Sequence, residues 1–198
     1  GDMLDRLVDV LTSLQSPAIL ADAYGDVVAL NMAFLEIINL PLQEMNDLVF
    51  RSRYNFFRWL CAPEYNLQRI VAGTGYSEFV HYMILMFKMM SLKLRCQPYF
   101  LRLVPELNHL PLFRKEWQAP FIQDDEMMNI LIPLSIHHPV FGVLNMLTMP
   151  QATFSRQGDL YLYNFVALDA ETAKSFQAIV KKTGNRSIRL SGWPKPIV

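Results

Sequence analysis

The N-terminal part of the sequence predicts a helix, a β-hairpin and a second helix. Apolar residues recur at helical spacing over residues 3–14, which predicts a short amphipathic helix. Ala18–Asp22 and Val27–Asn31 are strand-like runs on either side of a Tyr-Gly-Asp turn, so they predict a β-hairpin. The side chain of Asn31 is suited to cap a helix, and we expect that helix to stop near residues 39–41.

The middle of the chain predicts helices, one of which is long and rich in methionine. Short helices are expected over 42–63, one long helix over 66–95, and shorter helices over 99–107 and 112–117. The segment Phe79–Met90 is apolar almost all the way round a helix. The long helix therefore needs packing partners on most of its sides.

The faces of this long helix differ in composition. Its polar residues recur every seven positions, and we expect them to face water as one narrow stripe: Thr74, His81, Lys88 and Arg95. Methionine is unbranched and polarizable and adapts to irregular neighbours. The remaining face therefore either packs into a core or lines a cavity for a flexible apolar ligand.

From about residue 127 the pattern changes to that of strands. Met127–Ile136, Val140–Met149 and Leu160–Ala167 are rich in β-forming residues, and they predict an antiparallel meander. Asp169 is expected to cap a last helix, which ends near Lys182.

This pattern divides the chain into three parts, namely an N-terminal linker helix over 1–16, a main domain over 17–182 and a tail over 183–198. The linker helix either helps to pair two chains or packs on its own domain. The tail has no acidic residue. We expect it to be poorly ordered or to act as an arm onto a partner.

Composition excludes some classes of function. The 198 residues suffice for one domain with a full core. The 18 basic and 18 acidic side chains cancel, which excludes a strong electrostatic footprint for nucleic acid or an anionic membrane. No apolar run reaches the roughly 20 residues that a membrane span needs. Cys61 and Cys96 lack the spacing of a metal site, and we interpret them as reduced thiols of a cytoplasmic protein rather than as a disulfide.

Several segments resemble those of one known family, in the same order. Residues 19–31 look like the opening of the MmyB-type ligand-binding domain, which follows a helix-turn-helix in bacterial transcriptional regulators of the Xre class. Residues 55–64, with the sequence NFFRWLCAPE, and residues 112–117, with the sequence LFRKEW, are similar to later elements of that family. Residues 138–144 and 159–163 resemble its final strands.

The resemblance implies an α+β fold of the PAS-like type, in which a five-stranded antiparallel sheet faces a helical layer over a ligand cavity. It also implies a ligand-sensing regulatory domain. Separately, we expect the chain to form a homodimer. Fatty acid is the first candidate ligand, because members of this family are associated with fatty acid in the cavity. DNA contact is expected only through a helix-turn-helix domain outside this chain, since residues 1–16 hold one helix. The alternative function is a PAS-like dimerisation module with a filled core.

A long-chain fatty acid needs an apolar sleeve and a donor for its carboxylate. The sleeve candidates come from the long helix and from one face of a meander strand, and they are Tyr82, Met83, Met86, Met90, Leu144 and Met146. Arg58 is the head-group candidate, because a guanidinium offers a planar fork to a carboxylate. The alternatives for Arg58 are a salt bridge to Glu64 or Asp47, or a solvated position.

Other kinds of chemistry have little support in the sequence. His137 and His138 are adjacent, so their side chains point apart in a strand, and no further metal ligand has suitable spacing. The sequence has no glycine-rich phosphate loop and no Ser/His/acid arrangement. We therefore expect no metal, no cofactor, no catalytic residue and no enzymatic activity.

Overall fold

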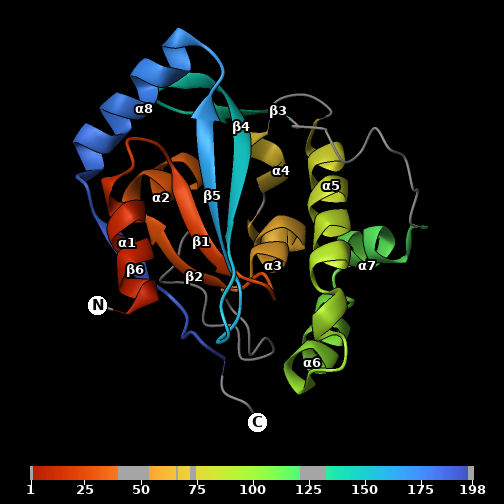
Figure 1. Ribbon diagram of the computed structural model, residues 1–198. Coiled ribbons are helices and arrows are strands. Elements are labelled where there is room, and N and C mark those ends of the chain that lie inside the picture. The colour runs from red at the N-terminus through yellow and green to blue at the C-terminus, as the bar shows by residue number, and fades with distance from the viewer. Residues whose placement is uncertain (1, 40–53, 66, 72–74, 121–132, 196–198) are drawn as a thin grey trace.

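The computed structural model of the protein describes residues 2–39, 54–65, 67–71, 75–120 and 133–195. Six strands form one antiparallel sheet: β1 (Ala18–Asp22), β2 (Val27–Asn31), β3 (Pro133–His138), β4 (Gly142–Thr153), β5 (Leu160–Ala167) and β6 (Ser187–Arg189). Their order in the sheet is β3-β4-β5-β1-β2-β6, and helices cover it (Figure 1). The prediction of an α+β fold is confirmed, whereas the prediction of five strands is wrong by one strand.

The N-terminal elements form where the sequence predicts them. They are α1 (Met3–Ser13), the hairpin β1-β2 and α2 (Met32–Ile38). The Asn31 side chain caps α2, since its oxygen accepts a hydrogen bond from the Phe34 amide at 3.0 Å. Gly25 in the hairpin turn has a φ of +80°, and a Cβ there would lie 2.6 Å from Phe57 Cδ2. Glycine is therefore required for both the turn and the close approach of Phe57.

The single long helix that the sequence predicts over 66–95 is not formed. The described residues of this segment form α4 (Leu67–Ile70), α5 (Gly75–Met90) and the 3-10 turn η3 (Leu92–Leu94). Val71 leaves the helical path and forms an isolated antiparallel bridge with Ile136 of β3. Pairing with this edge strand competes with helix formation, because the backbone groups of Val71 that bond to the strand are then not used for hydrogen bonds within a helix.

The polar stripe of α5 packs against another helix, with Lys88 buried and His81 37% exposed. Lys88 is buried, and its ammonium donates to the backbone oxygens of Glu116 at 3.1 Å and Ala119 at 2.9 Å. These oxygens lie at the end of α7 (Pro111–Gln118). His81 Nδ1 also lies 2.6 Å from Glu116 Oε2. Arg95 is exposed as expected, and Thr74 lies outside the described residues.

Other helices agree more closely with the sequence pattern. α3 spans Phe56–Cys61, α6 spans Pro98–Leu107 and α8 spans Ala170–Thr183. Asp169 caps α8, because its side chain accepts a hydrogen bond from the Thr172 amide at 2.7 Å. The meander β3-β4-β5 is confirmed, with β4 extending to Thr153; the start expected for its first strand, residues 127–132, lies outside the described residues.

The sixth strand comes from the segment expected to be a poorly ordered tail. Ile188 of β6 is opposite Leu30 of β2, and the Leu190 amide donates to the Val28 oxygen at 2.9 Å. β2 would otherwise leave one row of backbone groups unpaired at the sheet edge. Three residues are too few to display a strand period, which is why the sequence pattern does not predict β6.

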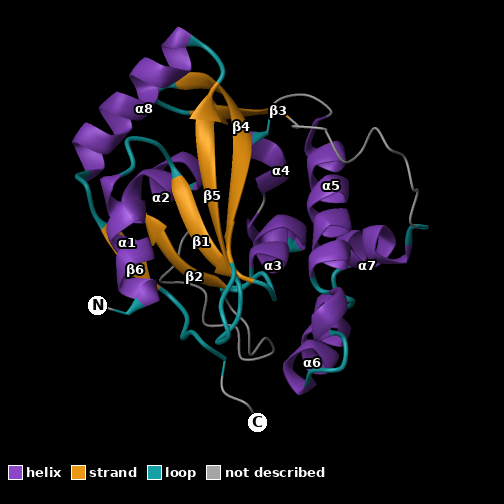
Figure 2. Cartoon of the chain, in the orientation of Figure 1, coloured by secondary structure: helices purple, strands orange, loops and turns teal. Residues whose placement is uncertain are grey.

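The two faces of the sheet pack against different helices (Figure 2). Side chains alternate along β1, so Ile19 belongs to the main core with α2, α3, α5 and α8, whereas Leu20 belongs to a second core under α1. Leu4 and Leu11 of α1 are buried in this second core. α1 thus packs on its own domain, which is one of the two roles expected for it, and its part in pairing chains stays a prediction.

Candidate ligand-binding site

An apolar pocket lies in the main core between the sheet and the helices. It encloses about 470 Å³ of space, part of which is open to solvent. The sheet contributes Leu134 and Ile136 of β3, Met146 of β4 and Phe165 of β5. These side chains share the inner face, because Leu134 is opposite Met146 in the strand register.

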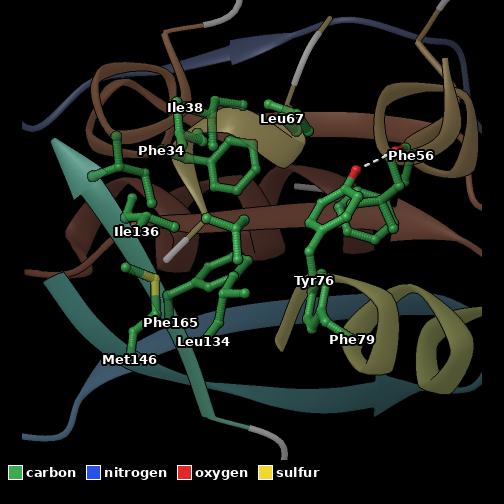
Figure 3. Close-up of a pocket in the computed structure, with 14 residues that line it drawn as sticks. Phe34, Ile38, Phe56, Leu67, Tyr76, Phe79, Leu134, Ile136, Met146 and Phe165 are labelled. Carbon is green, nitrogen blue, oxygen red and sulfur yellow. Dashed lines mark hydrogen bonds between the residues drawn. The ribbon is translucent and has the colours of Figure 1, made fainter. Parts of the chain in front are cut away.

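Helices α2 to α5 form the opposite wall of this apolar pocket. Phe56 and Leu60 come from α3, and Tyr76 and Phe79 come from α5. In Figure 3 Phe56, Tyr76 and Phe79 lie on one side of the pocket, across from the residues of the sheet. α3 begins at a capping residue, Asn55, whose side-chain oxygen accepts a hydrogen bond from the Phe57 amide at 3.0 Å. The cap thereby fixes where the aromatic side chains of α3 point.

Tyr76 is the one described residue of this pocket with a polar side chain. Its hydroxyl donates to the backbone oxygen of Leu60, and the dashed line in Figure 3 marks this hydrogen bond. Burial raises the pKa of the Tyr76 hydroxyl, and the charge of Cys61 adds to this effect. Since the hydroxyl is already satisfied within the protein, the pocket presents a hydrocarbon surface to a ligand.

The residues predicted to form one sleeve are distributed over two pockets. Met146 lines the apolar pocket. Met83, Met86 and Met90 line a second pocket, which we call the methionine pocket. It encloses about 330 Å³ of space, part of which is open to solvent. Phe56 lines both cavities and therefore lies between them.

Tyr82 and Leu144 are found among the described lining residues of neither pocket. Leu144 is fully buried in the main core. Tyr82 is partly buried at the edge of the same core, and burial raises the pKa of its hydroxyl. The sequence pattern gives the face of a helix or strand, and it does not tell which residue of that face borders an empty space.

Arg58, the predicted head-group residue, is also absent from the described lining of both pockets. Its side chain is 1% exposed, and its Nη2 lies 3.9 Å from Glu64 Oε1. The guanidinium carbon lies 5.7 Å from the centre of the Tyr65 ring. The salt bridge to Glu64 is therefore one of the alternatives that the sequence left open, and Asp47 lies outside the described residues.

A buried cluster of charges beside the methionine pocket is missed by the sequence analysis. Asp22 and Asp26, at the two ends of the hairpin turn, are both buried. Lys195 Nζ lies 2.7 Å from Asp26 Oδ2 and 3.5 Å from Asp22 Oδ2. Tyr99 of α6 donates its hydroxyl to the same oxygen of Asp26.

Burial and the charge of Asp26 raise the pKa of Asp22 to about 7, against the partial effect of Lys195. Acidic residues flanking a turn are ordinarily solvated, so the turn sequence alone gives no sign of their burial. The only signal in the sequence is Lys195, an isolated lysine in a C-terminal segment that has no acidic residue.

The remaining candidate residues have structural roles. His138 Nδ1 accepts hydrogen bonds from the amides of Val140 and Phe141 at 3.1 and 3.2 Å, which closes the β3-β4 turn. Among the described residues, no group of three or more His, Cys, Asp or Glu side chains is placed to hold a metal ion. Cys61 and Cys96 are free thiols, and burial together with the charge of Glu116 raises the pKa of Cys61 to about 12.

Comparison with protein families identifies the domain. Residues 3–179 match the MmyB-like transcription regulator ligand binding domain. The chain belongs to this family. It is thus a ligand-sensing regulatory domain of a transcription regulator, and its expected ligand class is a small molecule. No curated protein matches the sequence.

The family match gives the class of function, and it extends over the elements that form the apolar pocket. Within the part of the chain that the structure describes, no helix is both long and apolar enough to cross a membrane.

Proposed function

We propose that this MmyB-like domain senses a long apolar ligand, with a long-chain fatty acid as the first candidate. The observation that supports this proposal is the apolar pocket, whose lone described hydroxyl is already bonded within the protein. A helix-turn-helix domain outside this chain would contact the DNA. Ligand binding would bias that attached domain by favouring one arrangement of α4 and α5, which line the pocket and contact β3.

Hydrocarbon burial supplies the binding energy in this proposal. Each methylene removed from water contributes about 0.8 kcal/mol, and the ordering of a flexible chain offsets part of that gain. A fourteen-carbon acid should therefore bind better than an eight-carbon acid.

Arg58 remains the candidate partner for a carboxylate head group. It comes from α3, the helix that also contributes Phe56 and Leu60 to the apolar pocket. Its 3.9 Å separation from Glu64 is longer than a charge-assisted hydrogen bond. A ligand carboxylate at the pocket mouth would compete with Glu64 for the guanidinium.

Mass spectrometry of an organic extract from freshly purified protein tests the proposal directly. A fatty acid in stoichiometric amount is the expected result. The extracted protein should then bind alkanoic acids with an affinity that rises with chain length, as measured by calorimetry. An empty extract together with an affinity that does not depend on chain length would overturn the proposal.

The alternative function is a dimerisation module with a filled core, and one observation favours pairing of two chains. α1 packs against β1, β2 and β6, and the same outer face of β4 and β5 retains exposed apolar side chains. Val143 is 47% exposed and Val166 is 40% exposed, and the pairing of Leu147 with Val166 places them on one face. Light scattering of wild type and of the double variant Val143→Glu/Val166→Lys tests this pairing. A mass that stays unchanged in the variant would exclude this face as the interface.

A further inference from the structure

The methionine pocket has one charged side chain among its described lining residues, Asp22. Oδ1 of this carboxylate accepts hydrogen bonds from the amides of Tyr24 at 2.9 Å and Asp26 at 3.0 Å. Oδ2 is buried and accepts no hydrogen bond from the described residues. Its nearest cation is Lys195 Nζ at 3.5 Å, and this ammonium lies closer to Asp26 Oδ2, at 2.7 Å.

The rest of the lining is suited to an organic cation. Phe57 and Phe87 are stacked with their ring centres 4.4 Å apart, and both line the pocket. Aromatic faces attract ammonium groups, and thioethers adapt to alkyl chains of varied shape. A ligand carboxylate would instead meet the like charges of Asp22 and Asp26, which disfavours it. The pocket therefore selects by charge as well as by shape.

We propose that the methionine pocket binds a primary alkylammonium, whose N–H donates to Asp22 Oδ2 while its alkyl chain packs on Met83, Met86 and Met90. This ligand class differs from a fatty acid, and the site is separated from the apolar pocket by Phe56. The inference thus goes beyond the proposed function and does not depend on it.

The geometry predicts how binding depends on pH. The groups facing Asp22 are Asp26 of the turn, Lys195 of the C-terminal segment, Tyr24 and Tyr163. The pKa of Asp22 is raised to about 7, so part of this carboxyl is protonated near neutral pH. An ammonium pairs with the ionised form, and its own pKa lies near that of lysine, well above this range. Alkylammonium affinity should therefore increase from about pH 6 to about pH 8.

Calorimetry with hexylammonium, hexanol and hexanoate on the 198-residue chain tests the proposal. At about pH 8 we expect hexylammonium to bind at least about tenfold more tightly than hexanol, and hexanoate to bind most weakly. Hexyltrimethylammonium lacks an N–H donor and should bind less tightly than hexylammonium. Equal affinities for hexylammonium, hexanol and hexanoate would overturn the proposal without any variant.

Variants then locate the site. Asp22→Asn retains Oδ1 as acceptor for the two backbone amides, so the turn is preserved while the charge is removed. It should weaken hexylammonium by about tenfold and leave hexanol unchanged. Asp5→Asn, a surface acid paired with Arg189, is the matched control and should change neither affinity. Met86→Trp should block both ligands, and unchanged hexylammonium binding in Met86→Trp would exclude this cavity as the site.

These outcomes are independent of the fatty-acid proposal. Long-chain acids should bind Asp22→Asn as they bind wild type, since their proposed site is the apolar pocket. If the wild-type protein binds hexylammonium but no fatty acid, only the proposed function is rejected. If it binds a fatty acid but no hexylammonium, only the ammonium site is rejected.

Discussion

Lys195, in the C-terminal segment, lies 2.7 Å from Oδ2 of Asp26 in the first hairpin. The contact links the first hairpin to the last described residues in one charged cluster. β6 pairs with β2 of the same hairpin, so backbone hydrogen bonds and an ion pair both fix the C-terminal segment. The ring of Tyr99 lies 5.4 Å below the ammonium and adds a third contact from α6.

Lys195→Met should destabilise the domain, since it removes the cation that lies between two buried carboxylates. Loss of one partner from a buried ion pair costs about 3–5 kcal/mol, and the partial exposure of Lys195 places the expected cost at the lower end of that range. Urea unfolding at about pH 8 measures it. Lys174→Met, which removes an exposed pair with Glu171, is the control and should cost less than about 1 kcal/mol. Equal effects of the two variants would show that the cluster contributes nothing to stability.

Asp22→Asn should stabilise the protein more at neutral pH than in acid. The folded-state pKa of Asp22 is about 7 and lies above its ordinary value of 3.8, so between these values the unfolded chain has released a proton that the folded chain keeps. Ionisation of Asp22 therefore lowers stability as pH rises through this window. The gain in unfolding free energy of Asp22→Asn over wild type should grow from about pH 4 to about pH 7.

Asp169→Asn provides a control of opposite sign. Hydrogen bonds from the Thr172 amide and from Asn145 hold the pKa of Asp169 below its ordinary value. Its contribution to stability is therefore present above the unfolded pKa and is lost as pH falls through the folded pKa. Urea titrations at a series of pH values compare the two variants. A gain for Asp22→Asn that is the same at every pH would contradict the assignment.

Gly25→Ala should be destabilising, because the residue has a φ of +80° and a new Cβ would meet Phe57. The steric and backbone terms together should cost about 2–4 kcal/mol. Gly142→Ala is a matched control, with a φ of +71° and no described atom within 4 Å of the new Cβ. It should cost only about 1 kcal/mol, the backbone term alone. Equal thermal-unfolding shifts for the two variants would show that the contact with Phe57 adds nothing to the loss of stability.

The sequence predicts the elements that have a clear period and fails where single contacts decide. The hairpin, the meander and α8 have strand or helix periods over five or more residues, and the structure contains them. The break at Val71 depends on a bridge to Ile136, a residue far away in the chain. Lys88 is buried because backbone oxygens of α7 accept from it, and no side-chain pattern reveals such acceptors.

The candidate site shows the same limit. Four of its seven predicted residues, Met83, Met86, Met90 and Met146, line a cavity, and their part in binding a ligand stays a prediction. Their division between two cavities depends on the position of Phe56, and that position depends on the Asn55 cap and on packing. Asp22 was missed because turn acids are usually solvated, whereas here Lys195 and Tyr99 cover the turn.

Leu67→Trp should block ligand entry to the apolar pocket. Leu67 is partly exposed on α4 and lines the pocket, so a larger side chain at this position fills the cavity without overpacking the buried core. The affinity of the extracted protein for a fourteen-carbon acid should fall at least about tenfold, which calorimetry measures. Leu92→Trp, at a site that is 61% exposed, is the control and should bind as wild type does. Unchanged binding in Leu67→Trp would place the fatty-acid site elsewhere.

Arg58→Met should separate recognition of the carboxylate from recognition of the chain. Methionine retains much of the apolar volume of arginine on α3, so the wall beside Phe56 and Leu60 is preserved while the guanidinium is lost. If the guanidinium binds the head group, affinity for the fourteen-carbon acid should fall about tenfold or more, and affinity for the matching alcohol should stay unchanged. Glu64→Gln is the matched control, because it removes the negative charge of the carboxylate that lies 3.9 Å from Arg58 Nη2 and should make the guanidinium a better partner for the acid. Equal losses for acid and alcohol in Arg58→Met would instead assign Arg58 a purely structural role, in which it supports α3 through Glu64 and Tyr65.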